Sequence, residues 1–563
     1  MSTCYYHVCQ LNVVILGRLH QCFRVELVRK VEMAEAILAQ LRAPGRLERD
    51  RGLAGLQAAL VPGDGQTIVT GVGAGLAAVT PHSELSWEEK VGYLAAARLL
   101  LGGAPGHAPP PAQACAAAWL CDSEARVRTG AGELLGALCR ARGVAVWDAE
   151  RGRVLQLVTE NLQRGEGREA GLEDKLGAAA VYHDTAGWRC LETSLVCLQR
   201  MVEGLEDKAV HCWKPELLKL LLSCLSHTNR FVRETGYQLL AALLTTSSQP
   251  GTEEPMEVEQ AVEAVEGGAE LAGDPLAQHG ALLAPQLAAG LSDNWSQVRL
   301  AASVATRALL TGLAEGRRAA LYPTLLPRLC LNRYYLAEGV RIHSQQTWRQ
   351  VAGQQGKQLV ETHILHTVQY YTAATQADNH AVREAACQCI AELAAKLDRE
   401  VVRPHAPALL NTLLVCFQDD SWPVRDHACV AAGSFLAAFP AEGRPALSAF
   451  LPLFLKNLAD PIASVRQGAA LALANTVRAY GEDALQPVLE EVVAGLAGVE
   501  QQPQESERYG SWEAGPAQFG VAKKVRDNDP ALHEDQTLYS CGSLAPKMRS
   551  GGGGCTDAKF RKE

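Results

Sequence analysis

The stretch Asp419-Asp-Ser-Trp-Pro-Val-Arg425 decides the fold, because copies of it return along the chain at a nearly constant interval. Each copy has an acidic residue, a few polar or turn-forming residues, and then Val-Arg. In the second half of the chain the interval between successive motif arginines is 42 three times and then 41, and these arginines are Arg299, Arg341, Arg383, Arg425 and Arg466. A fixed period of this length predicts a repeat of two helices.

The residues around each motif carry the signals of a helix, a turn and a second helix. An apolar stretch with helical spacing, 406–417, precedes the motif, and prolines stand near its start, where a helix tolerates them. The acid and the Ser or Asn residues supply turn and N-cap chemistry. A second apolar stretch, 428–439, follows Val-Arg, and the Pro/Gly segment 440–445 closes the unit.

A small residue stands four positions after each motif valine. Positions i and i+4 share one helix face, so a small side chain there lets the second helix approach its neighbours closely. The set comprises Ala131, Gly236, Ala302, Ser344, Ala386, Ala428 and Ala469. The pattern therefore has a structural reason. Together with the regular interval, it predicts an all-α solenoid of two-helix repeats, each about 42 residues long.

These motifs resemble those of the HEAT-repeat family, whose members include importins, phosphatase scaffold subunits and microtubule-binding TOG arrays. The resemblance implies a buried ladder in which the motif acid and arginine pair between adjacent repeats. The acids and arginines carried over are Asp122 and Arg128, Asp184 and Arg189, Asp293 and Arg299, Asp378 and Arg383, Asp419 and Arg425, and Asp460 and Arg466. In two repeats another residue stands in place of the acid, namely His227 before Arg233 and Tyr335 before Arg341. We expect irregular steps there.

The spacing also divides the chain into segments. We expect an irregular N-terminal extension over 1–30, degenerate repeats over 31–246 with a polar insertion near 164–175, and regular repeats over 275–498. The segment 247–274 has eight acidic residues and no Lys or Arg, which predicts a disordered acidic loop. It is interpreted as a solvated loop, or alternatively as an arm for a basic partner. Residues 499–563 show no sustained helical period, which predicts a disordered tail. The last repeat lacks an obvious polar cap, which would be expected of a fragment or a shorter isoform.

Composition and charge exclude some classes of function for this chain. Between residues 281 and 495 we count 18 basic and 18 acidic side chains, which argues against a broad phosphate-binding face and hence against nucleic acid. No apolar run is long enough to span a membrane. The 17 cysteines show no paired CxxC pattern, and many fall inside apparent helices. They indicate buried small residues and a reducing compartment, the cytosol or nucleus.

Phosphate-loop, HExxH and GxSxG motifs are absent. Gly71, Gly73 and Gly75 form GxGxG without a surrounding strand and helix, and we interpret them as a loop. Deoxyhypusine hydroxylase, an iron enzyme, resembles this architecture but uses several His-Glu pairs; here His-Glu occurs only at His533-Glu534. His363 and His366 are three apart, but we find no third ligand and read them as a surface pair. No metal, cofactor or small-molecule substrate is expected.

The sequence therefore predicts a non-catalytic scaffold or adaptor that binds proteins. Alternatives are an importin-like transport receptor, a TOG-like tubulin binder and, last, a HEAT-like metalloenzyme. Trp295 and Trp422 occupy turns, as the tryptophan of TOG arrays does, but the matching basic residues are mostly absent, with Arg230 the main one. These tryptophans either pack on an adjacent turn or contact a partner.

Overall fold

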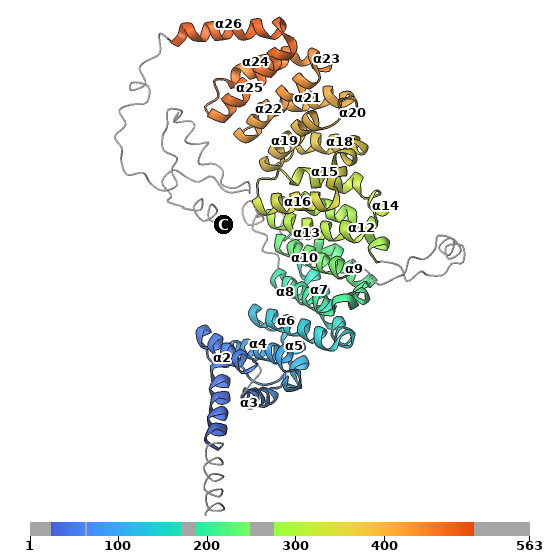
Figure 1. Cartoon of the computed structure of the whole chain (residues 1–563). Helices are drawn as coiled ribbons and strands as arrows, with labels where there is room; N and C mark the ends of the chain where they lie inside the picture. Colours follow the sequence, from blue (N-terminus) through green and yellow to red (C-terminus); the bar gives the residue numbers. More distant parts are fainter. Residues whose placement is uncertain (1–23, 62–64, 170–186, 248–274, 500–563) are drawn as a thin grey trace, which may run out of the picture. The chain divides into compact units, whose positions relative to one another are not determined.

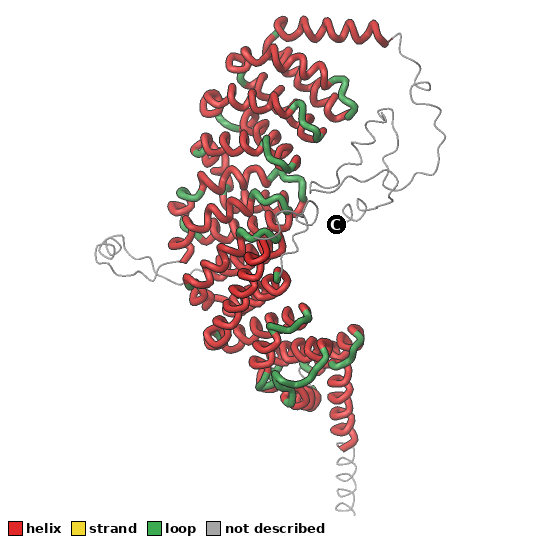
Figure 2. The backbone as a smooth tube through the Cα atoms, turned by 180° about the vertical axis from the view of Figure 1, so that it is seen from behind, coloured by secondary structure: helices red, strands yellow, loops and turns green. Residues whose placement is uncertain are grey.

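The computed structural model describes residues 24–61, 65–169, 187–247 and 275–499 (Figure 1). Throughout these ranges the regular elements are helices, and no strand occurs among them (Figure 2). The chain divides into two compact units, residues 1–276 and 277–563. No helix in the described ranges combines the length and the apolar character needed to cross a membrane. The prediction of an all-α solenoid of paired helices is confirmed.

Unit 1 begins with a helix over residues 24–41, so helical structure starts inside the segment expected to be irregular. The longer helices that follow are α2 (Arg46–Ala59), α3 (Gln66–Ala77), α4 (Trp87–Gly103), α5 (Ala112–Trp119), α6 (Ala125–Arg142), α7 (Val144–Glu169), α8 (Trp188–Leu205), α9 (Pro215–Leu225) and α10 (Arg230–Ser247). Helix α7 continues to Glu169, through the first residues of the expected polar insertion. The rest of that insertion, the acidic loop after residue 247 and the tail after residue 499 lie outside the described residues.

Unit 2 repeats one arrangement, a first helix, a short turn and a second helix, which is the longer of the two in every pair but the first. The first helices are α12 (Pro275–Leu291), α15 (Tyr322–Asn332), α18 (Ile364–Ala374), α21 (Ala406–Cys416) and α24 (Leu447–Asn457). Their second helices are α13 (Ser296–Gly312), α16 (Glu338–Val351), α19 (His380–Lys396), α22 (Trp422–Ala438) and α25 (Ala463–Tyr480). The short helices α14 (Glu315–Arg318), α17 (Gly356–Thr362), α20 (Arg399–Val402) and α23 (Pro440–Gly443) connect them, and α26 (Glu482–Val499) follows.

Second helices pack side by side, α19 against α22 and α22 against α25. The small residue that follows each motif valine by four positions is buried in every repeat. Close approach is most evident where Gly433 of α22 meets α25. A Cβ added to Gly433 would lie 2.6 Å from Cα of Ala472. Backbones therefore touch at this crossing, and side-chain size there limits how tightly consecutive repeats stack.

Gly71, Gly73 and Gly75 do not form a loop, because all three lie inside α3. The loop interpretation was wrong for a tertiary reason. An added Cβ would lie 2.4 Å from Leu38 Cδ1 at Gly75 and 2.6 Å from the carbonyl oxygen of His107 at Gly73. These glycines let a helix lie against its neighbours at short range, and that gain outweighs their low helix propensity.

Buried cysteines fill the interior. Cys224, Cys330, Cys387, Cys416 and Cys429 are all buried free thiols, as the sequence predicts. Burial raises the pKa of the Cys224 thiol to about 12. These five cysteines thus pack as small apolar residues.

Replacement of Gly204 by alanine tests the packing of unit 1. Gly to Ala inside a helix is normally stabilising by roughly 0.5–1 kcal/mol. At Gly204 in α8, however, the added Cβ would lie 2.1 Å from the carbonyl oxygen of Gly136 in α6. We expect Gly204→Ala to lower the unfolding free energy of unit 1 by about 1–3 kcal/mol. Gly152→Ala is the control, because no atom lies within 4 Å of its added Cβ. Urea unfolding should show the first variant destabilised and the second neutral or stabilised.

Candidate protein-interaction site at the repeat turns

The turn between α21 and α22 shows how the motif works. Asp419 Oδ1 accepts a hydrogen bond from the backbone N–H of Ser421 at 2.8 Å, which fixes the start of the turn. Arg425 Nη1 donates to the carbonyl oxygens of Asp419 at 2.9 Å and Asp420 at 3.2 Å. The arginine therefore satisfies carbonyl groups that follow the end of the first helix.

The same closure recurs at turns in both units. In each case one guanidinium nitrogen donates to the carbonyl oxygens six and five positions earlier in the chain. The arginines that do so are Arg49, Arg128, Arg233, Arg383, Arg425 and Arg466. Arg299 makes a related bond from Nε to the carbonyl oxygen of Asp293 at 3.1 Å. The first role of the motif arginine is thus to hold its own turn closed by hydrogen bonds to carbonyl oxygens.

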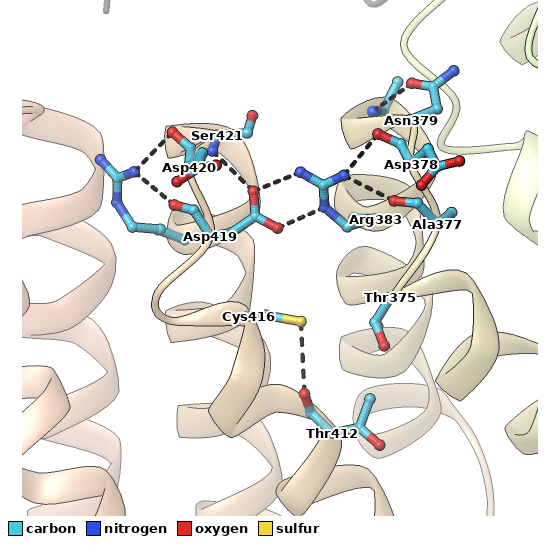
Figure 3. Close-up of polar contacts among 12 residues, drawn as sticks. Thr375, Ala377, Asp378, Asn379, Arg383, Thr412, Cys416, Asp419, Asp420 and Ser421 are labelled. Atoms are coloured by element: carbon cyan, nitrogen blue, oxygen red, sulfur yellow. Dashed lines mark hydrogen bonds and ion pairs between the residues drawn. The ribbon is translucent and has the colours of Figure 1, made fainter.

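The ladder appears where the same arginine also reaches the next repeat. Arg383 binds Asp419 with two hydrogen bonds, Nε to Oδ2 at 2.6 Å and Nη2 to Oδ1 at 2.8 Å (Figure 3). Arg425 Nε binds Asp460 Oδ2 at 3.0 Å. All these side chains are largely buried. The hydrogen bonds with Asp419 raise the pKa of Arg383 above its ordinary value.

Other steps substitute a neutral partner for the acid. Arg299 is fully buried, donates to Asn332 Oδ1 at 2.6 Å and lies 4.2 Å from the centre of the Tyr335 ring. Arg128 Nε donates to Thr193 Oγ1 at 3.0 Å. At these steps a hydrogen bond from the guanidinium to an uncharged acceptor, or a cation over a ring, replaces the salt bridge.

The remaining predicted ladder residues lie elsewhere. Arg341 is paired with Glu338 of its own helix at 3.9 Å. Arg189 lies over the ring of Trp188 at 5.3 Å, and its expected partner Asp184 is outside the described residues. The exposed carboxylate of Asp378 is not part of the ladder, since only its carbonyl oxygen binds Arg383.

Two largely buried ion pairs are not predicted by the sequence. Lys90 Nζ binds Asp122 Oδ2 at 2.7 Å. Lys90 follows Arg49 at the same interval that separates Arg466 from Arg425, so the repeat spacing itself contained this signal. Arg333 and Glu392 form a second pair, Nη2 to Oε2 at 2.6 Å, which joins the end of α15 to α19. That pair falls outside the motif register, and no spacing rule would have found it.

The three candidate partner contacts differ in exposure. Trp422 is exposed at the first position of α22, whereas Trp295 is half-buried. The Arg230 guanidinium lies over the ring of Phe231, 4.6 Å from its centre. Of the three, Trp422 presents the most accessible aromatic surface at a turn.

The two histidines considered for a metal lie together, with ring centres 6.3 Å apart. Burial, and then the nearby His366, lower the pKa of His363. Within the described residues, no group of three or more His, Cys, Asp or Glu side chains is placed to hold a metal ion.

Comparison with known proteins agrees with the repeat class. The family model of the HEAT-like repeat matches residues 380–434, which span α19, α21 and most of α22. No curated protein sequence matches the chain. Within these residues the prediction of HEAT-type repeats is confirmed.

Solved structures with a related course of helices include an engineered protein, importin beta and Kap121p bound to Pho4p. The engineered protein has 14% identity and a TM-score of 0.32, with 79% of this chain and 98% of that chain covered. Importin beta has 11% identity and a TM-score of 0.41, with coverage of 82% and 54%. The Kap121p structure has 12% identity and a TM-score of 0.41, with coverage of 86% and 49%. The chain thus spans about half the length of importin beta and Kap121p.

Arg425→Ala tests the ladder in unit 2. Loss of the guanidinium leaves the buried Asp460 carboxylate without its cation and opens the turn at Asp419, which should cost about 3–5 kcal/mol. Arg403→Ala is the control, because its pairs with Glu400 and Glu442 are at the surface, where solvent screens them, and their loss should change stability little. Thermal unfolding measures both. An unchanged melting temperature for Arg425→Ala would contradict the ladder.

The Lys90–Asp122 pair predicts a dependence of stability on pH. Burial alone would raise the pKa of Asp122, but hydrogen bonds from Lys90 and from the Glu124 backbone N–H, with the charges of Lys90 and Arg128, lower it overall. A lowered folded-state pKa gives stability above the ordinary pKa that is lost as pH falls through the folded pKa. Between about pH 5 and 3, the unfolding free energy of unit 1 should therefore fall more steeply in the natural chain than in Asp122→Asn. Hydrogen exchange of α4 and α6 measures this, and equal slopes would contradict it.

Proposed function

We propose that the chain is a non-catalytic scaffold that holds other proteins along the face of its second helices. The supporting observation is one register in unit 2, the position five residues after the motif arginine. It is occupied by Val304, Gln388, Val430 and Leu471 on α13, α19, α22 and α25. All four side chains are uncharged, and all are at least partly accessible, Val304 being 39% and Leu471 52% exposed.

These four positions have a fixed orientation because each preceding arginine is bound to its own turn. The bond between guanidinium and turn carbonyls sets the rotation of α13, α19, α22 and α25 about their axes. Residues five positions later therefore point in the same direction from their turns. A repeated, uncharged and accessible register suits an extended protein ligand better than a small molecule, which needs a concave and convergent site.

The proposal includes a reducing compartment, the cytosol or nucleus. The cysteines described in the structure are free thiols, and most are buried. Thiols of this kind are typical of proteins that do not pass through an oxidising compartment.

Charge insertion on this face tests the proposal. Partners are first identified by affinity purification with mass spectrometry and then produced in pure form. Val304→Glu combined with Leu471→Glu should weaken their binding at least about tenfold, because an unpaired charge would be buried in the interface. Leu365→Glu on first helix α18 is the matched control, since Leu365 is also apolar and exposed.

Isothermal titration calorimetry measures the affinities, and circular dichroism checks that each variant is folded. The proposal fails if the double variant binds every identified partner as tightly as the natural chain does. It also fails if Leu365→Glu weakens binding to the same extent.

A further inference from the structure

A groove lies between two consecutive turns of unit 2, the one that joins α18 to α19 and the one that joins α21 to α22. Its volume is about 840 Å³, and its lining includes Asp378, His380, Val415, Asp420 and Ser421. The ladder pair of Arg383 and Asp419 also lines it (Figure 3). The groove is therefore built around the ladder contact between these repeats.

The groove carries an excess of negative charge. Asp419 is neutralised by the two hydrogen bonds from Arg383. Asp378 and Asp420 are exposed, and neither side chain has an ion-pair partner among the described residues. Burial, and then the charge of Arg383, lower the pKa of His380, so its imidazole is neutral at neutral pH and does not offset the two carboxylates. Two neighbouring carboxylates of this kind attract a cation.

A second, independent observation points to a ligand. Ser421 lines the groove and is only 5% exposed, yet its Oγ has no hydrogen-bond partner. A buried hydroxyl normally has a partner, because leaving it unpaired costs free energy. A ligand with a polar group at this position would supply the missing hydrogen bond.

The wall of the groove also offers apolar surface. Val415 of α21 is 64% exposed beside the carboxylates. A lysine or arginine side chain matches this combination, because its aliphatic stem packs on apolar surface while its charged end reaches an acid. A simple inorganic cation would make no use of Val415.

The next turn lacks this chemistry. Counted from the motif acids Asp419 and Asp460, the residues that correspond to Asp420 and Ser421 are Pro461 and Ile462. The carboxylate and the hydroxyl are thus not general requirements of the repeat.

We propose that this groove is a docking site for a basic segment of a partner protein. A lysine or arginine of the segment lies on Val415 with its cation between Asp378 and Asp420, and a neighbouring polar group of the segment binds Ser421 Oγ. The site lies on the turns and not on the second-helix face. It rests on the proposed function only in that its ligand is a protein.

Peptide binding to the full chain tests the site. The probes are short fluorescein-labelled peptides with one lysine or arginine between leucines, matched peptides with norleucine at that position, and a peptide of residues 559–563, the basic end of the chain itself. Fluorescence anisotropy should show that the lysine or arginine peptides bind and the norleucine peptides do not. Binding should weaken as salt is added.

Two variants assign the binding to the groove. Asp378→Asn combined with Asp420→Asn should lower the affinity at least about tenfold, while Glu490→Gln, which removes an exposed carboxylate on α26, should leave it unchanged. Ser421→Ala should lower the affinity severalfold without lowering the melting temperature, because the hydroxyl it removes has no partner in the free protein.

Equal affinities of the groove variants and the natural chain would overturn the proposal, and so would a lack of binding by every basic peptide. Tightest binding by residues 559–563 would also overturn it, because the occupant would then be the chain itself. None of these results tests the second-helix face, which is tested separately by the charge-insertion variant that combines Val304→Glu and Leu471→Glu. The two proposals can therefore fail independently.

Discussion

The packing of consecutive repeats depends on the guanidinium group of the motif arginine, which binds its own turn and the next turn at the same time. A guanidinium has five N–H donors in a rigid plane, so it can bind two sets of acceptors at once. Arg383 uses Nη1 for the carbonyl oxygens of its own turn and Nε with Nη2 for Asp419 of the next turn. Closing a turn and spacing the next repeat are therefore one interaction. This explains why the arginine returns with so little variation in interval, since the chain must come back to the same place each time.

Two arginines that depart from this arrangement show which of the two sets of bonds is kept. Arg128 still binds the carbonyl oxygens of its turn, although beyond the turn its Nε donates to the hydroxyl of Thr193 and not to an acid. Arg299 keeps a bond to its turn and finds Asn332 and Tyr335 beyond it. At these two steps turn closure thus persists while the partner in the next repeat varies, whereas Arg341 is paired with Glu338 of its own helix. The acid adds a charged bond where it is present, but a buried amide or hydroxyl takes its place without loss of the turn.

The sequence predicts the features that every repeat shares, and it does not predict the contacts that vary from one repeat to the next. The period and the helix pairs were predictable, because every repeat needs the same residues at the same places. Lys90 was also within reach, since it stands in register with Arg49. The Arg333–Glu392 pair was not, because it joins elements outside the register. Gly75 was misread because its role is a contact with Leu38, and local sequence does not contain the distance between two helices.

The candidate site illustrates the same limit at the scale of single residues. Asp419 and Asp420 are adjacent and chemically identical, yet one is held by Arg383 and the other is exposed at the groove. The sequence alone places both residues in the turn. Only the direction of each side chain shows that Asp419 belongs to the ladder and Asp420 to the surface. Ser421 is similar, because its backbone N–H is needed by Asp419 whereas its hydroxyl is bound to nothing. In a repeat protein each turn must keep its geometry but not every side chain. The positions that geometry leaves open are where binding specificity can arise, and in this turn they are Asp420 and the hydroxyl of Ser421.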